Sequence, residues 1–412
     1  EQEEHDVYPD DPDFDINKAR LVTTAPRICV RYECVPMRFI KHVYKIHTYA
    51  QDGRLFEGKT PVSAFLNSSY DGSFIAGLME LRYIQSLPVE RIINYFESHG
   101  FTLKKPTAHK LMEKASSLFE NLYKCIRQTA LSDPYKAADE TYYKILVPEK
   151  NSKGKGVRKG YLWVVVGINT RMIYLLYDDG SRSEKVILNE LGGCKGIIQS
   201  DGYSPYRKLE SDAYPHITRI PCLQHIKRKF IDCGEDDPDA KRIVEMINTL
   251  YQNEHKHKIG VDGWTVEQNL VHRKKYAPDI LGEIKDVLDD IEERGDLLPK
   301  SELKEAITYL RNEWNAVVDI FNYGDTYLDN NIVERMNRYI SLSRKNSLFF
   351  GSHKGAERGA ILYTIALTCR MNKVNLFEYL TDVINRTAEW QPNTPLEKYR
   401  QLLPDRWEKA ND

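Results

Sequence analysis

The feature that most constrains the fold is a change of period near residue 136. Residues 61–130 place apolar side chains at helical spacing, whereas residues 136–225 favour strands. Strand-like segments are ADETYYKILV, KGYLWVVVGINT, RMIYLLYDDGS, GIIQSD and ITRIPC, and the third and fourth of these flank a short helix, SEKVILNELGG, that ends at glycine. The second and third segments are joined at Asn169-Thr170. Three strands, a helix, a strand, and a further helix and strand predict an α/β fold.

A helical block interrupts this α/β plan. Residues 226–325 are helical by periodicity, and Thr265 and Gln268 have the spacing of a capping box. Helical patterns continue through residues 326–390. The order of elements matches a ribonuclease-H-like core, so the predicted fold is a ribonuclease-H-like catalytic core interrupted by an α-helical insertion. A small N-terminal β segment and a helical, helix-turn-helix-like DNA-binding domain precede it.

The N-terminal helices allow two interpretations. SAFLNSSYDGSFIAGLMELRYIQS predicts a first helix, Pro88 and Gly100 bound a second, and KPTAHKLMEKASSLFENLYKCIRQT predicts a third. A short helix, a glycine-containing turn and a third helix are typical of a helix-turn-helix. A plain helical bundle has the same pattern, so both interpretations stay open.

The predicted domain organisation has seven parts. They are a disordered acidic tail at 1–20, a small β segment at 21–60, a helical DNA-binding domain at 61–130, the first part of the core at 131–225, the α-helical insertion at 226–325, the second part of the core at 326–390 and a C-terminal tail at 391–412.

Composition indicates an ordinary globular chain. The net charge is −1, but KNSKGKGVRKG, HIKRKF, HRKKY and SRKNS are basic stretches, so several surfaces suited to nucleic acid are compatible with a neutral total. Seven cysteines form no CxxC pair, which favours reduced thiols. With no apolar run of roughly 18 residues and no signal-peptide pattern, the expected location is the cytoplasm, with no membrane partner.

Three acids have notable positions. Asp139 lies on the first strand of the core, Asp201 ends the fourth strand, and Glu334 lies on a helix after the insertion. An unpaired charge at the end of a buried strand is costly, so Asp201 is either a turn residue, as Asp-Gly commonly is, or held there for chemistry. Neighbouring first and fourth strands would bring Asp139 and Asp201 together. Glu334 could instead pair with Arg338 at i,i+4.

Several motifs make the chain resemble the insertion sequence sixty-six family of bacterial transposases. They are ADETYYKIL, SDGYSPY, PCLQHIKRKF, DNNIVERMNRYISLSRKNSLFFGSHKGAERGAILYTIALTCRMNKVNLFEYL and, more loosely, RYIQSLPVERIINYFESHGFTLKKPTAHKLM. The likeness covers roughly residues 20–390, and its C-terminal half is the most specific part.

The resemblance implies a DDE-type DNA transposase of an insertion sequence. Asp139, Asp201 and Glu334 would bind two Mg²⁺ ions, which Mn²⁺ could replace. Such enzymes hydrolyse a transposon end to free a 3′-hydroxyl, which then attacks target DNA in line. The implied partners are transposon-end and target double-stranded DNA, a second protomer or a larger synaptic complex, and accessory proteins of the same element in a bacterial, nucleoid-associated setting.

The resemblance also includes a Cys-x-x-His pair, here Cys222 and His225. His225 would touch the scissile phosphate or hold a catalytic carboxylate, while a buried thiol and a capping histidine is the plain structural alternative. As half of a zinc site the pair lacks a CxxC partner. Residues 21–60 resemble a degenerate zinc-finger remnant, since Ala50 and Gly53 replace expected cysteines and Cys29 and Cys34 complete no site. Zinc is therefore not expected there, and the chain could be truncated relative to a full transposase.

Basic residues cluster beside the acids in the sequence. We interpret them as phosphate contacts, with a solvated charged face as the alternative. They are Lys227, Arg228, Lys229, Arg335, Arg338, Arg344 and Lys345.

Three other functions compete with a transposase. A catalytically inactive or domesticated DNA-binding relative would bind DNA without cutting it. A nuclease of the same fold, such as a junction resolvase or ribonuclease H, would cut without strand transfer. A glycosidase would need two carboxylates in a sugar cleft, which the strand order does not favour.

Overall fold

The computed structural model describes most of the chain and divides it into two units, Glu1–His42 and Val43–Asp412. The described residues are Asn17, 37–51, 54–57, 63–65, 68–149, 156–234, 236–391 and 393–409. The predicted acidic tail at 1–20, apart from Asn17, and the residues Cys29, Cys34 and Gly53 lie outside them. All that follows concerns the second unit.

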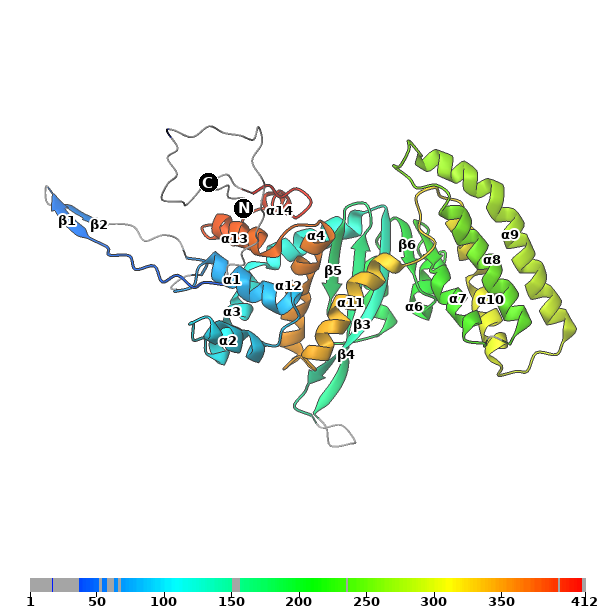
Figure 1. The fold of residues 1–412 in the computed structure, drawn as a ribbon, viewed down its shortest axis with the longest axis horizontal. Helices are drawn as coiled ribbons and strands as arrows, with labels where there is room; N and C mark the ends of the chain where they lie inside the picture. The colour runs from blue at the N-terminus through cyan, green and yellow to red at the C-terminus, as the bar shows by residue number, and fades with distance from the viewer. Residues whose placement is uncertain are drawn as a thin grey trace. The chain divides into compact units, whose positions relative to one another are not determined.

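A five-stranded mixed sheet forms the centre of the second unit (Figure 1). Its strands are β3 (Tyr135–Leu146), β4 (Val157–Gly167), β5 (Met172–Leu176), β6 (Gly196–Ser200) and β7 (Ile217–Pro221), in the spatial order β5-β4-β3-β6-β7. β3, β4 and β5 pair antiparallel, whereas β6 runs parallel to both β3 and β7. The prediction of a mixed α/β fold is confirmed, and so is the pairing of the first and fourth strands.

Burial explains why these segments form strands. The run LWVVVG of β4 is buried throughout, as expected for a central strand covered on both faces. The edge strand β5 is covered by α12 (His353–Met371) rather than by another strand. Thr364 Oγ1 accepts a hydrogen bond from Leu175 N at 2.9 Å, and Thr368 Oγ1 donates to Ile173 O at 2.9 Å. These bonds satisfy backbone groups that would otherwise be exposed at a sheet edge.

The N-terminal helices pack against the C-terminal ones. They are α1 (Gly72–Met79), the π-helical turn η1 (Glu80–Ile84), α2 (Val89–Ser98), α3 (Lys105–Leu118) and α4 (Glu120–Ser132). α1 packs on α13 (Leu376–Thr387), α3 on α12, and α4 on β5 and on α14 (Leu396–Arg400). The contacts thus join the two ends of the unit, and the predicted domain boundaries remain predictions.

The sequence pattern was wrong at three places in this N-terminal part. The first helix begins at Gly72 and not at residue 63, because the Asp71 side chain accepts from Phe74 N and caps the helix there. The third helix is two helices that meet at Phe119. Strand structure predicted between 21 and 50 is limited, in the described part, to β1 (Thr48–Gln51), which pairs with β2 (Arg54–Glu57).

The block between β7 and the last helices is helical, as predicted. It contains α7 (Leu223–Ile231), α8 (Pro238–Glu254), α9 (Val266–Arg294) and α10 (Glu302–Ile320), and α9 begins at the expected capping box of Thr265 and Gln268. Its apolar side chains form one cluster with Tyr135, Ile197 and Ile220 of the sheet. The block therefore shares a hydrophobic core with the β6–β7 side of the sheet (Figure 1).

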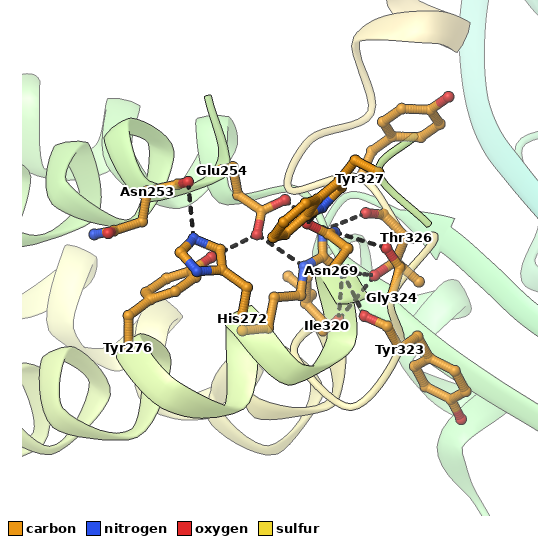
Figure 2. A network of polar contacts seen from close by, with 12 residues as sticks. Asn253, Glu254, Asn269, His272, Tyr276, Ile320, Tyr323, Gly324, Thr326 and Tyr327 are labelled. Carbon is orange, nitrogen blue, oxygen red and sulfur yellow. Dashed lines mark hydrogen bonds and ion pairs between the residues drawn. The ribbon is translucent and has the colours of Figure 1, made fainter. Parts of the chain in front are cut away.

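A buried arginine connects this helical block to the segment immediately before α11 (Asn331–Asn346). Arg273, 1% exposed, makes two hydrogen bonds to the Glu254 carboxylate, at 2.8 and 2.6 Å. The same guanidinium donates to Thr326 O at 2.6 Å and to Tyr323 O at 2.6 Å. Figure 2 shows this network, in which Asn269 also donates to Gly324 O. The segment before α11 is thus held by the insertion.

Among the helices of the described residues, none is long and apolar enough to cross a membrane. The five described cysteines, Cys125, Cys194, Cys222, Cys233 and Cys369, are free thiols.

Replacing Arg273 tests the strength of this connection. We expect Arg273→Met to lower the free energy of unfolding by about 3–5 kcal/mol, because Glu254 would keep a charge that has lost its buried partner. The measurement is urea-induced unfolding followed by circular dichroism. Arg311→Met is the matched control, since Arg311 also pairs with two acids of the insertion but is 26% exposed; it should cost about 0–1 kcal/mol. Equal losses in the two variants would contradict the assignment.

Candidate functional site

The sheet brings Asp139 and Asp201 together. β3 and β6 run parallel with Ala137 opposite Gln199, so two residues further along the chain Asp139 is level with Asp201, directly after the end of β6. The negative charges of Asp201 and Glu140 both act on the Asp139 carboxyl. These two acids therefore meet at the carboxyl end of β6, where the sequence places them.

Asp139 carries a strongly perturbed carboxyl group. Burial, followed by the charges of Glu140 and Asp201, raises its pKa from 3.8 to about 8. Its hydrogen-bond partners are neutral: Asp139 Oδ1 accepts from the Glu140 backbone N–H at 2.8 Å, and Oδ2 accepts from Asn337 Nδ2 at 2.5 Å. A bound cation would remove the repulsion that these donors leave uncompensated.

Two asparagines of the segment DNNIVERMN fix α11 on β3. Asn330, immediately before the helix, donates through Nδ2 to Ala138 O at 3.0 Å. Asn337 lies seven positions later on the same face and donates to Asp139. Glu334 lies between them in the sequence and lines the same hollow as Asp139. Sequence reasoning missed the role of both asparagines, although both lie in the motif that carried the resemblance.

Glu334 faces α7. Its Oε1 is 3.6 Å from His225 Nδ1. Cys222, at the N-terminal cap of α7, adds its sulfur to this group, and Cys222 Sγ, one imidazole nitrogen of His225 and one carboxylate oxygen of Glu334 all lie within 4.8 Å of one another. In the described part of the chain, the ion-pair partner of Glu334 within 4.0 Å is His225 rather than Arg338. Burial raises the pKa of the Cys222 thiol to about 12.

Asp201 also has the turn geometry considered from the sequence. Its Oδ1 accepts from Tyr203 N at 3.1 Å, and its backbone carbonyl accepts from Arg219 Nη2 at 2.7 Å. A Cβ at Gly202 would lie 2.4 Å from the Tyr309 hydroxyl of α10, to which Gly202 N donates at 2.9 Å. Glycine is therefore required by the approach of the insertion, and the turn is compatible with a role for the second carboxylate oxygen of Asp201.

Glu140 is a further acid that sequence reasoning missed. Its side chain is 6% exposed, and its Oε1 accepts from Arg182 Nε at 3.0 Å. Burial raises its pKa, Arg182 lowers it, and the charge of Asp201 raises it again. The signal was present in the sequence, since Glu140 follows Asp139 directly. Arg182 pairs with Glu140, so it is not reserved as an ion-pair partner for Asp139 or Asp201.

A solvent-filled hollow lies between β3, α7 and α11. Its volume is about 470 Å³, and Asp139, Glu140, His225, Glu334 and Asn337 line it. Arg335 and Arg338, both exposed, line the same hollow. A second hollow of about 330 Å³, also bordered by Glu334, is lined by Lys227 and Arg228. Four of the seven basic residues selected from the sequence thus surround the acids.

The other three basic residues lie differently. Lys229 is placed over the ring of Tyr309, 5.9 Å from its centroid. Arg344 lies on the ring of Tyr142, 3.9 Å from its centroid, and donates to Tyr142 O, so its guanidinium helps to hold α11 on β3. Lys345 is exposed. Their contacts with DNA remain predictions.

The donor chemistry of this site suits divalent cations. Carboxylate oxygens from Asp139, Asp201 and Glu334 are the hard ligands that Mg²⁺ takes, usually with water and phosphate completing its shell. Two buried side-chain oxygens, Glu334 Oε1 and Asn337 Oδ1, have no hydrogen-bond partner. Such atoms are consistent with a site that binds a further group. Asp139, Glu140 and Glu334 make the hollow acidic, Arg335 and Arg338 add basic groups to its wall, and Asp201 lies at the end of β6 outside its lining residues.

The family follows from a comparison with known proteins. The family model described as "Transposase IS66 family" matches residues 67–358, more than half of the chain. The chain belongs to this family of transposases. The match includes Asp139, Asp201, His225 and Glu334.

Curated relatives are uncharacterized proteins of Sinorhizobium fredii. The protein y4jD is 26% identical over 81% of this chain, and y4hP is 24% identical over 96% of it. The chain spans 65% of the length of y4jD and 76% of that of y4hP. Among solved structures, a piggyBac transposase synaptic complex with hairpin DNA is matched over 83% of this chain and 77% of that one, with 10% identity and a TM-score of 0.26. A score this low does not establish a shared fold.

The raised pKa of Asp139 predicts a pH-dependent stability. The folded protein keeps this proton up to pH about 8, whereas the unfolded chain loses it near pH 3.8. The stability that this group contributes is fully present below pH 3.8. It falls as the pH rises from 3.8 to about 8 and changes no further above pH 8. In EDTA, we expect Asp139→Asn to be more stable than wild type by an amount that grows up to pH 8, reaching on the order of a few kcal/mol.

Thermal unfolding of both proteins from pH 5 to pH 9 measures this difference. The variant can keep the contact with α11, because Asn337 Oδ1 has no partner and its amide can turn. Asp212→Asn, an exposed acid in the loop before β7, is the control and should follow wild type. Magnesium should stabilise wild type more than Asp139→Asn. A pH-independent difference would show that Asp139 has an ordinary pKa.

Proposed function

We propose that the chain is a DDE-type DNA transposase with a ribonuclease-H-like core. The observation that carries the proposal is the position of Asp139, whose carboxyl is repelled by Asp201 and shares a hollow with Glu334. The strand order β5-β4-β3-β6-β7, with β4 antiparallel to its neighbours, supports a ribonuclease-H-like core. Membership of a transposase family supports the activity.

The proposed ligands of two Mg²⁺ ions are Asp139, Asp201 and Glu334. Their oxygens are of the right kind, and a cation would compensate the burial and, after it, the repulsion by Glu140 and Asp201 that raise the pKa of Asp139. Bound magnesium, or manganese in its place, would neutralise charge on the scissile phosphate and favour ionisation of the attacking hydroxyl.

The residues of the chain itself supply positioning. Asn330 and Asn337 hold α11 against β3, so that Glu334 and Asp139 keep a fixed separation. Arg335 and Arg338 on one side, and Lys227 and Arg228 on the other, would bind the phosphates of a duplex laid over the hollow. His225 beside Glu334 would orient that carboxylate.

The proposed reaction has two steps on one site. Water first attacks the phosphate at a transposon end, and the bond to the 3′-oxygen breaks to free a 3′-hydroxyl. That hydroxyl then attacks a phosphate of target DNA in line, and the target strand leaves with its own 3′-oxygen. No covalent bond to the protein is needed, so the protein positions groups and compensates charge.

DNA ends and target DNA are the proposed partners, together with a second protomer and accessory proteins of the same element. A protein of this kind would act in the bacterial cytoplasm on the nucleoid. The helical block between β7 and α11 would contact DNA or the second protomer. An inactive DNA-binding relative and a nuclease without strand transfer remain the competing functions.

Cleavage of a labelled duplex from the end of the encoding element tests the proposal. Loss of a residue that only supports a metal ligand typically lowers metal affinity or activity by about 10–100-fold. Asp201→Asn removes a proposed ligand itself, so it should reduce the rate of nicking by roughly 100-fold or more. Nicking should require Mg²⁺ or Mn²⁺. Asp212→Asn is the control for a nearby, exposed carboxylate and should cut as wild type does.

The outcomes separate the competing functions. Equal nicking by wild type and Asp201→Asn would mean that Asp201 is only a turn residue. End binding without nicking by either protein, in the presence of the accessory proteins, would favour the inactive relative. Nicking without joining to target DNA would favour the nuclease.

A further inference from the structure

A thiol, an imidazole and a carboxylate lie together at one side of the hollow. Cys222 and His225 come from the start of α7, and Glu334 comes from the first turn of α11. One ligand atom from each lies within 4.8 Å of the other two. The sequence offered only the Cys-x-x-His half of this group, and the fold supplies the third member.

The distance between His225 and Glu334 does not suit a hydrogen bond. Nδ1 and Oε1 are 3.6 Å apart, whereas a direct N–H···O contact to a carboxylate is about 2.7–2.9 Å. A tetrahedral ion with bonds of about 2.0–2.2 Å to nitrogen and oxygen holds these two ligand atoms roughly 3.3–3.5 Å apart. The observed separation is close to that value and leaves room for a metal ion between the two atoms.

The same two atoms are buried and without a hydrogen-bond partner. His225 Nδ1 and Glu334 Oε1 are both buried atoms that lack a hydrogen-bond partner, although each side chain as a whole is 32% exposed. Buried polar atoms of native proteins almost always have a partner, so two such atoms facing one another indicate a missing third group. A cation between them would satisfy both.

Two backbone N–H groups are directed at the Cys222 sulfur and partly offset the burial that raises the pKa of its thiol; a coordinated divalent cation ionises such a thiol outright. Cys222 Sγ accepts a hydrogen bond from Asn330 N at 3.3 Å, and the backbone N–H of His225 also stabilises the ionised sulfur. Backbone N–H groups directed at a sulfur favour the thiolate, which is the form that binds metal. Thiolate and carboxylate together balance the charge of one divalent ion.

We propose that Cys222 Sγ, His225 Nδ1 and Glu334 Oε1 bind one Zn²⁺ ion. A thiolate with an imidazole selects zinc over magnesium, and three protein ligands leave a fourth position for water. Because a carboxylate has two oxygens, Glu334 can serve this ion with one and a magnesium ion with the other. The zinc ion ties α7 to the start of α11 and so holds Glu334 in place.

The zinc content of purified protein tests this site. We expect about one zinc per chain after expression with added zinc and purification without chelator, measured by mass spectrometry of the metal. Cys222→Ser and His225→Gln should each lower this content several-fold. Cys233→Ser, at the far end of α7, is the matched control and should keep the wild-type content, as should Asp139→Asn and Asp201→Asn.

Cobalt gives a second readout that does not depend on the fold of a variant. Co²⁺ added to chelator-treated wild type should produce thiolate-to-cobalt absorption in the near ultraviolet, which Zn²⁺ abolishes and Cys222→Ser lacks. Equal zinc in wild type and Cys222→Ser, or no thiolate–cobalt absorption in wild type, would overturn the proposal. Neither measurement uses DNA, so this site can fail while the proposed transposase activity stands, and the reverse.

Discussion

The structure of the site depends on how α11 is fixed to β3. Two side-chain amides do this, Asn330 on the carbonyl of Ala138 and Asn337 on the carboxylate of Asp139. Since they lie on one face of the helix with Glu334 between them, the two bonds set both the axial position and the rotation of α11. Arg344 extends the attachment by about two more turns, on Tyr142. These contacts join β3 and α11, which are far apart in the sequence. We call this pair of elements, with Asp139 and Glu334, the carboxylate frame.

The insertion contacts the segments on either side of this carboxylate frame, next to Asp201 and before α11. Arg273 holds the carbonyls of Tyr323 and Thr326, a few residues before α11 begins, and Tyr309 accepts from Gly202 next to Asp201. Buried Arg219 of β7 joins Glu313 of α10 to the backbone of Asp201. Because these contacts reach both Asp201 and the approach to Glu334, a load applied to the helical block by DNA or a second protomer would be transmitted to the carboxylates. The insertion is consequently part of the site's support and not an appended domain.

Local pattern and long-range contact differ in how far they could be predicted. The strands of the sheet, the capping box at Thr265 and the position of Asp201 at a strand end follow from period and turn chemistry, which are properties of a few neighbouring residues. The start of α1 at Gly72 was missed because apolar spacing continued upstream while the Asp71 cap decided the boundary. The partnership of Cys222 with Glu334, and of Asn337 with Asp139, joins residues distant in the chain, and no local pattern contains such information. Glu140 was overlooked for a different reason: it follows Asp139 directly, but neighbours on a strand usually point to opposite faces, so its place in the same hollow as Asp139 required the geometry.

The distribution of charge around Asp139 supports the proposed binding of cations at this site. Asp139 is held by neutral donors, a backbone N–H and an amide, and Arg182 is paired with the neighbouring Glu140. Arg335 and Arg338 line the hollow but are exposed, where solvent screens their effect. A protein that needed these carboxylates only for stability would gain more from a buried arginine, as Arg273 and Arg219 show elsewhere in this chain. Burial beside Glu140 and Asp201 makes ionisation of Asp139 costly in the folded chain, and the proposed divalent ion would lower that cost by compensating the charge, so that part of the cost would appear as metal affinity.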